Sequence, residues 1–268
     1  ATNKGLTVID QLGGKIIIPI EKDKLLQEDI QSISKSRDGV YFVGTSTGVY
    51  LYDPYSFQTI TSYEGIPVAE NWMSGILDID IDNNGYLWIA SGEFGIFKLK
   101  NGVIVEHFNS DNSEIPQNYT CQIKFSKDGS VWFAHPYGGI SKYSNGKIQN
   151  MTEYLKIPSN TVTSDIAFDS EGTIWIATSR GLGMFKNDSL AIFNEKDGLV
   201  RPFAECDVNV GYNDEIIYNT YGSGFSIYKD GKFTNYDESN GLADNRIWDL
   251  AIDSENNYWL ALDGQGVQ

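Results

Sequence analysis

The sequence predicts an all-β fold, a six-bladed β-propeller of four-stranded antiparallel blades, closed by a blade shared between the N- and C-terminus. The first observation is an apolar segment that recurs six times around an aromatic or aliphatic anchor. The anchors are Phe42, Trp88, Trp132, Trp175, Ile217 and Trp259. They follow one another at intervals of 46, 44, 43, 42 and 42 residues. The second observation is that each interval holds several short strands and turns, which at this period is typical of a propeller.

The fourth copy shows the order of elements within one repeat. Alternating apolar and polar residues predict a first strand at 164–168 and a second at 173–178. The turn between them, 169–172, contains Asp and Gly, which favour tight reversals. A third strand at 182–185 and a fourth at 189–193 follow, joined by a hairpin. Four antiparallel strands of this length make one blade.

The other copies repeat these parts. Their third strands open with a glycine, at Gly48, Gly95, Gly139, Gly181 and Gly224. Several hairpins between third and fourth strands carry Asn-Gly or Asp-Gly pairs, which tolerate a positive φ angle. The recurring turn chemistry therefore supports the four-stranded blade.

The repeat indicates a single propeller domain over 1–268, because each unit buries its faces only against its neighbours. The predicted full blades are about 28–70, 71–117, 118–159, 160–202 and 203–244. The sixth blade is split. Residues 245–268 would supply its first two strands and residues 1–27 its last two, which hides the open edges of the array. Residues 266–268 also resemble the start of a third strand and compete with 5–10 for that position.

Composition excludes several classes of partner. The net charge of −16 argues against nucleic acid, whose binding needs a basic surface. No run of eighteen apolar residues is present, so no membrane span is expected in this chain. The two cysteines, Cys121 and Cys206, are expected to be free, buried thiols, because their repeat positions lie two blades apart.

At this point the residues resemble a known family. Asp169 to Phe185, followed by Asp197-Gly198-Leu199, resembles the two-component regulator propeller repeat, and Asp82 to Phe97 is a second good copy. The resemblance implies an input module of bacterial signalling proteins, often hybrid histidine kinases, located in the periplasm or outside the cell. Such sensors frequently respond to breakdown products of polysaccharides. The repeat specifies strands and turns rather than a pocket, so it indicates the fold more firmly than the ligand.

Catalytic motifs have weak support. Gly44-Thr45-Ser46-Thr47-Gly48 matches the pattern of a nucleophile elbow, but it joins two strands and not a strand and a helix. The two histidines do not suggest a zinc cluster, nor the histidine-based chemistry that resemblance to virginiamycin B lyases would require. We therefore expect no catalytic residue, no metal site and no cofactor.

An aspartate recurs in the predicted first strands, at Asp78, Asp165, Asp207 and Asp249. The stretch that begins at Asp78 lacks the glycine and glutamate that an EF-hand needs at its sixth and twelfth positions. We expect these carboxylates to bond to neighbouring backbone. An acidic ring or cation site around a central channel is the alternative.

A ligand site is predicted where the loops between second and third strands meet the entries to first strands, since both lie at the channel mouth of a blade. The predicted site residues are Trp72, Glu93, Tyr119, His135, Tyr137, Arg180, Tyr221 and Arg246. Aromatic faces beside arginine, histidine and carboxylate groups suit a polar ligand with apolar patches, such as a sugar. Trp72, Tyr119 and Tyr137 would stack on it, while Arg180, Arg246 and His135 would orient its polar groups.

The leading hypothesis is therefore a non-catalytic ligand sensor that binds a small molecule or an oligosaccharide and shifts between signalling states. A protein–protein interaction scaffold, including a homodimer, is the alternative. A lyase or glycosidase using a carboxylate such as Glu93 or Asp263 is a third hypothesis, without a motif to support it.

Overall fold

A computed structural model describes residues 7–9, 15–17, 30–37, 39–53, 58–62, 65–67 and 75–268. The chain divides into two compact units, 1–125 with 146–148 and 126–145 with 149–268. Every sheet in the described residues is antiparallel, and the fold is an all-β, six-bladed β-propeller, as predicted. None of the described helical turns is long and apolar enough to span a membrane.

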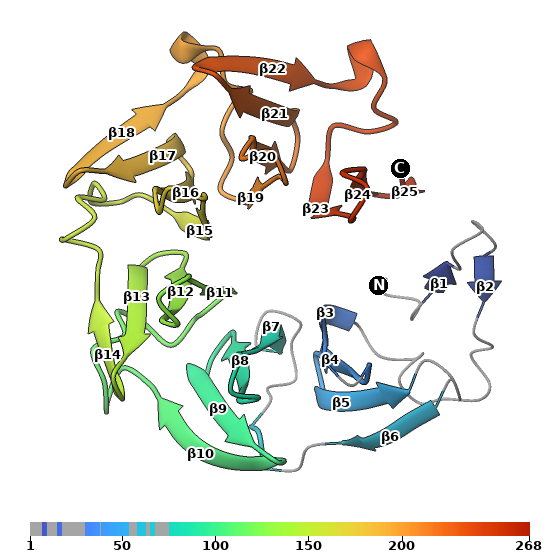
Figure 1. Cartoon of the computed structure of the whole chain (residues 1–268), viewed down its shortest axis with the longest axis vertical. Helices are drawn as coiled ribbons and strands as arrows, with labels where there is room; N and C mark the ends of the chain where they lie inside the picture. Colours follow the sequence, from blue (N-terminus) through green and yellow to red (C-terminus); the bar gives the residue numbers. More distant parts are fainter. Residues whose placement is uncertain are drawn as a thin grey trace. The chain divides into compact units, whose positions relative to one another are not determined.

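The first two blades belong to the first unit (Figure 1). The first blade consists of β3 (Ile30–Lys35), β4 (Tyr41–Thr45), β5 (Gly48–Asp53) and β6 (Gln58–Ser62). The second consists of β7 (Ile76–Ile81), β8 (Leu87–Ser91), β9 (Ile96–Lys100) and β10 (Val103–Phe108). A separate pair, β1 (Thr7–Ile9) and β2 (Lys15–Ile17), forms a two-stranded sheet.

Four further sheets follow along the chain. The third comprises β11 (Gln122–Phe125), β12 (Val131–His135), β13 (Gly139–Ser144) and β14 (Lys147–Asn150). The fourth comprises β15 (Thr163–Phe168), β16 (Ile174–Thr178), β17 (Gly181–Lys186) and β18 (Ser189–Phe193). The fifth comprises β19 (Cys206–Val210), β20 (Ile216–Thr220), β21 (Gly224–Lys229) and β22 (Lys232–Tyr236). The sixth has three strands, β23 (Ile247–Ile252), β24 (Tyr258–Leu262) and β25 (Gly266–Val267).

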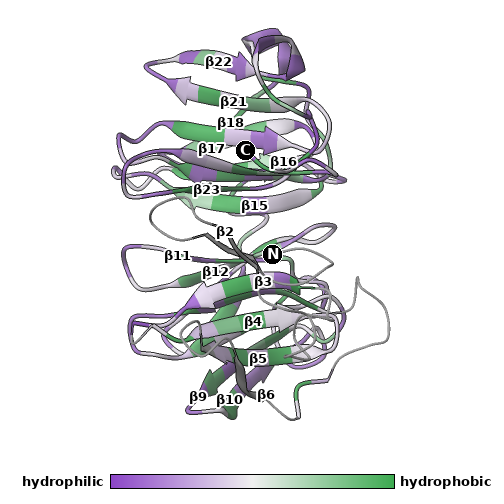
Figure 2. Ribbon diagram, turned by 90° about the vertical axis from the view of Figure 1, so that its right-hand side faces the viewer, coloured by the Kyte–Doolittle hydropathy of each residue, from purple (hydrophilic) through white to green (hydrophobic). Residues whose placement is uncertain are grey.

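The second strand of each blade is its most buried element. All five residues of β8 and of β12 are buried, and Trp88 is completely inaccessible to solvent. Figure 2 shows the hydrophobic residues concentrated in the strands and the hydrophilic ones in the turns that join them. Five of the six anchors found in the sequence, Phe42, Trp88, Trp132, Trp175 and Ile217, are therefore core residues, whereas Trp259 of the sixth blade is 42% exposed.

An aspartate at the first turn explains the Asp-to-Trp spacing of the repeat. The indole Nε1 of Trp175 donates to Asp169 Oδ2 at 3.0 Å, while Asp169 Oδ1 accepts from the backbone N–H of Thr173 at 2.8 Å. The same indole bond recurs between Trp88 and Asp82 at 3.1 Å. One carboxylate thus fixes the turn and satisfies the polar atom of the large core side chain.

The fifth blade replaces this pair by another arrangement. Gly211 occupies the aspartate position, and the carboxylate of Glu215 lies where a side chain on Gly211 would be. Glu215 is 3% exposed and accepts from Tyr258 Oη at 2.9 Å and from Asn256 Nδ2 at 3.3 Å, both in the sixth blade. Burial alone would raise the pKa of Glu215, but the hydrogen bonds it accepts outweigh burial and hold it below its ordinary value.

The recurring first-strand aspartates connect neighbouring blades. Asp78 Oδ1 accepts from the next N–H of its own strand at 2.8 Å, and its Oδ2 accepts from Ile123 N in β11 at 2.7 Å. Asp165 bonds in the same way, to Ile166 N at 2.8 Å and to Val208 N in β19 at 3.1 Å. These bonds confirm the expectation of backbone partners for these two carboxylates. They also show that each carboxylate joins two first strands.

The glycines that open the third strands have a steric cause. A Cβ atom on Gly95, Gly181 or Gly224 would overlap the carbonyl oxygen of the last residue of the following fourth strand. All three also have positive φ angles, at 87°, 126° and 74°. Two independent causes therefore require glycine at these positions, the positive φ angle and the close contact with the backbone of the fourth strand.

The C-terminal segment takes part in the sixth sheet. β24 pairs with β25, and Leu260 exchanges both backbone hydrogen bonds with Gln268. The start of a third strand expected at 266–268 is therefore present, and a short hairpin of this kind has a low entropic cost of closure. Residues 7–9 pair with 15–17. Completion of the sixth blade by residues 1–27 stays a prediction.

Candidate functional site

The predicted site residues fall into different environments. Trp72 lies outside the described residues. In the first unit Glu93 is exposed and Tyr119 is half-buried. In the second unit Tyr137 is 79% exposed, and the guanidinium of Arg180 donates to the carbonyl of Ser159 at 3.0 Å.

His135 differs from the prediction because it is completely buried. Its Nε2 bonds with the hydroxyl of Ser141 at 2.8 Å, and Thr163 Oγ1 donates to its carbonyl at 3.0 Å. A side chain held in this way inside β12 cannot orient a ligand at the surface. His135 is a core residue of the third blade.

Tyr221 and Arg246, by contrast, are brought together as the loop geometry predicted. They form an isolated antiparallel bridge between the second-to-third loop of the fifth blade and the entry to the sixth. Gly222 N and Gly224 N both donate to the carbonyl of Asn245, at 3.1 and 3.0 Å. These backbone bonds fix the positions from which the two side chains project.

Two aspartates complete this group. Arg246 donates through Nε and Nη2 to the two oxygens of Asp244, at 3.0 and 2.6 Å. Its Nη1 lies 2.6 Å from Asp263 Oδ2, which also accepts from Tyr221 Oη at 2.9 Å. The hydrogen bond and charge of Arg246 hold the pKa of Asp244 below its ordinary value, and the hydrogen bond to Asp263 raises the pKa of Tyr221.

Trp248 supplies an apolar face beside these polar groups. Its ring centroid lies 4.4 Å from that of Tyr221, and the side chain is 53% exposed although it belongs to strand β23. We name Tyr221, Asp244, Arg246, Trp248 and Asp263 the mouth cluster. The sequence reasoning did not include Trp248 or Asp244, although Trp248 stands out in its repeat position, where the fourth and fifth copies have Ser164 and Cys206.

A further aromatic ring lies next to the mouth cluster. The ring of Phe203 lies where a side chain on Gly222 would be, within 3.1–3.6 Å of the position of its Cβ. The guanidinium of Arg201 lies 5.6 Å from the centroid of the same ring. The loops around the mouth cluster therefore present aromatic faces and charged groups together, which is the composition of a recognition surface.

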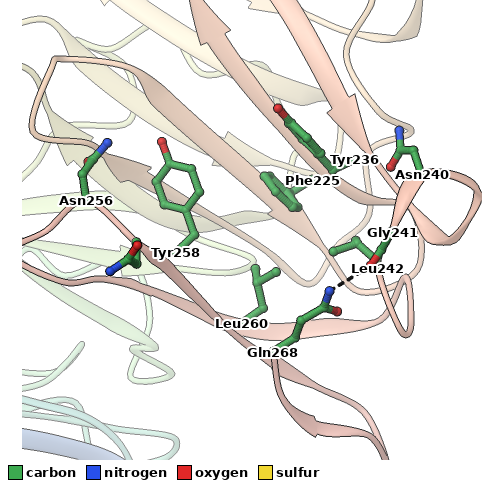
Figure 3. A pocket seen from close by; sticks show the side chains of 10 residues that line it. Phe225, Tyr236, Asn240, Gly241, Leu242, Asn256, Tyr258, Leu260 and Gln268 are labelled. Atoms are coloured by element: carbon green, nitrogen blue, oxygen red, sulfur yellow. Dashed lines mark hydrogen bonds between the residues drawn. The ribbon is translucent and has the colours of Figure 1, made fainter. Parts of the chain in front are cut away.

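A cavity of about 450 Å³ lies elsewhere in the second unit (Figure 3). Its wall includes Phe225 and Tyr236, whose stacked rings are 4.7 Å apart, together with Tyr258 and Leu260. Gln268 borders it and donates to the carbonyl of Gly241 at 2.8 Å.

The fourth and fifth blades show which side chains fill the equivalent position between another pair of blades. There, Phe193 holds the position of Tyr236, and it contacts Tyr228 of a third strand at 5.3 Å and Phe233 of a fourth strand at 5.6 Å between ring centroids. The cavity lies at the corresponding position between the fifth and sixth blades, where aromatic side chains of neighbouring blades pack. The mouth cluster is therefore the better candidate for a site.

The fold and the repeat define the class of protein to which this chain is similar. The model of the two-component regulator propeller matches residues 156–180, which confirms the resemblance found in the sequence. The repeat matched there runs through the boundary between the third and fourth blades and the strand that carries the Trp175 anchor.

Particular proteins are similar to this chain over most of its length. A curated relative, histidine kinase P4 of Formosa agariphila, is 26% identical over 256 residues, covering 87% of this chain and 18% of the relative. The extracellular domain of a putative hybrid two component system from B. thetaiotaomicron is 22% identical with a TM-score of 0.77, covering 97% of this chain and 35% of that one. The chain thus spans about a fifth to a third of the length of these proteins.

Virginiamycin B lyase from Staphylococcus aureus has the same kind of fold. It is 14% identical with a TM-score of 0.67, over 89% of this chain and 83% of the lyase. Identity at this level indicates a common fold alone, because one propeller architecture carries many unrelated functions.

Proposed function

We propose that this chain is a non-catalytic ligand-sensing propeller, the extracytoplasmic input module of a two-component-type regulator, and that it binds a small carbohydrate at the mouth cluster. The observation that carries the proposal is Trp248, a half-exposed indole held beside an ordered network of Tyr221, Arg246 and Asp263. An aromatic face next to oriented polar groups is the arrangement that binds a sugar ring and its hydroxyls.

The relatives support the regulatory part of the proposal. The curated relative is a histidine kinase, and the similar solved structure is the extracellular domain of a putative hybrid two component system. A ligand at the mouth cluster would act by binding one signalling state more tightly than the other, since only differential affinity shifts such an equilibrium.

The carboxylates considered for catalysis support a non-catalytic role. Asp263 is engaged by Arg246 and Tyr221, and Glu93 lies in the other unit on an exposed loop. A general acid or base needs a carboxyl placed close to a second catalytic group. The mouth cluster offers an ion-paired network instead.

Intrinsic tryptophan fluorescence and thermal denaturation of the chain, titrated with a panel of oligosaccharides, test the proposal. A ligand that binds the native state raises the melting temperature by mass action. Trp248→Ala should abolish that shift. Trp259→Phe is the matched control, because Trp259 is 42% exposed and bonds to Asp253 outside the cluster. Absence of any shift across the panel would favour the protein-interaction scaffold.

A further inference from the structure

The guanidinium of Arg246 already engages two carboxylates of the chain. Three of its N–H groups face Asp244 and Asp263 at 2.6 to 3.0 Å, and the Asp244 carboxylate that takes two of them is 10% exposed. A ligand carboxylate that sought the same bidentate contact would have to displace Asp244 from a charge-assisted pair. The geometry therefore favours a positioning role for Arg246 over bidentate binding of a ligand carboxylate.

The charge of the whole chain points in the same direction. The two aspartates and one arginine of the mouth cluster sum to −1, and the neighbouring Arg201 on the Phe203 ring offsets this locally, but the net charge of the chain is −16. An anionic ligand that approaches such a chain meets repulsion, whereas an uncharged ligand does not. The overall charge thus disfavours acidic sugars.

One acceptor of the network remains available to a ligand. Both bonds recorded for Asp263, from Arg246 and from Tyr221, end on Oδ2, and within the described part of the chain Oδ1 accepts no other hydrogen bond. The Asp263 side chain is 32% exposed. A carboxylate oxygen accepts hydrogen bonds only, so its ligand partner must be a donor.

We infer that the mouth cluster binds an uncharged pyranose and rejects the corresponding uronic acid. The C–H face of the sugar ring lies on Trp248, and a hydroxyl donates to Asp263 Oδ1. Arg246 is a positioning residue, which holds Asp263 from one side while Asp244 holds Arg246 from the other. This inference rests on the proposed function and specifies its ligand class.

Paired titrations of the chain test the inference, using neutral oligosaccharides of glucose or galactose and their uronic acid counterparts at low salt. Any neutral sugar that binds should bind at least about tenfold more tightly than its acidic partner. Asp263→Asn removes one negative charge and should reduce that ratio to about threefold or less, and added salt should reduce it in the wild type as well. Trp248→Ala should abolish binding of the neutral sugar, and Trp259→Phe should leave it unchanged.

The outcomes separate the two claims. A uronic acid that binds as tightly as its neutral partner, and loses binding in Trp248→Ala, would overturn the ligand class while keeping the site. Neutral sugars that bind equally well to Trp248→Ala would overturn the site itself. Retention of the full charge discrimination in Asp263→Asn would show that Asp263 does not cause it.

Discussion

Gly224 offers a direct test of the link between the repeat and the mouth cluster. A Cβ atom at this position would overlap the carbonyl oxygen of Tyr236 and lie 3.1 Å from its carbon and 3.2 Å from Asp237 Cα. These are backbone atoms of the closing fourth strand, so they cannot rotate away. Gly224 N also donates to Asn245, and the overlap would therefore move the loop that carries Tyr221.

The magnitude follows from a comparison with Gly172. Gly172 has a φ of 81° against 74° for Gly224, but a Cβ there meets nothing within 4 Å. Alanine at either position pays for a left-handed backbone, about 1–2 kcal/mol. Gly224→Ala adds an overpacking cost of about 1–3 kcal/mol. The unfolding free energy of Gly224→Ala should therefore be lower than that of Gly172→Ala by the overpacking cost, about 1–3 kcal/mol.

Urea unfolding followed by tryptophan fluorescence measures both variants under the same conditions. The midpoint for Gly224→Ala should be clearly lower than that for Gly172→Ala, and its sugar-induced thermal shift should be weaker. Equal midpoints for the two variants would refute the steric explanation of the third-strand glycines.

Three further predictions concern buried polar groups. Burial raises the pKa of Asp78 to about 7 from 3.8, so the folded state holds this proton more tightly than the unfolded chain. The contribution of Asp78 to stability should therefore be greatest below about pH 4 and decrease by up to about 4 kcal/mol as the pH rises to 7. Urea unfolding at pH 4.5 and 7.5 should show a smaller difference for Asp78→Asn, and an unchanged difference would exclude this carboxyl as the cause. Tyr258→Phe removes the 2.9 Å bond to the buried Glu215 and should cost about 1.5–3 kcal/mol, whereas Tyr212→Phe, at a 66% exposed position, should have almost no effect in the same assay. Burial raises the pKa of Cys206 to about 12, so a thiol reagent at pH 8 should modify this residue only as the protein unfolds. Cys121 is half-buried and not fully buried as expected, so the assay uses Cys121→Ser, and rapid modification of that native variant would contradict the burial of Cys206.

The blades were predictable because their signals are local. A turn aspartate and an indole six residues later, as in Asp169 and Trp175, are joined by one hydrogen bond. Each opening glycine is required by close contact with the end of a strand only about a dozen residues away. The closing blade was less predictable because two segments, 5–10 and 266–268, matched one position beside β24. Sequence pattern does not rank such competitors; in the structure β24 pairs with β25.

The site was predictable only in part. The loop geometry placed Tyr221 and Arg246 together correctly, since both positions follow from the order of strands within a blade. The pairing of Arg246 with Asp244 depends on side-chain geometry that spacing does not reveal. Trp248 was missed because apolar residues in strands are usually core residues, and its exposure becomes visible only in the folded chain.

In the fifth blade Gly211 replaces the turn aspartate and Glu215 supplies the carboxylate instead, and this replacement bears on the order of the blades. In the fourth blade the turn carboxylate of Asp169 accepts from Trp175 of the same blade, so this contact does not depend on which blade comes next. In the fifth blade the buried Glu215 accepts through Oε1 from Tyr258 and Asn256 of the sixth blade, and a neighbour without these donors would remove both bonds from a buried carboxylate. A blade with this exchange recognises its successor, so the repeats of this propeller are not interchangeable units. Replacing the fifth blade by a copy of the fourth would remove the hydrogen bonds by which this junction selects the sixth blade as its neighbour.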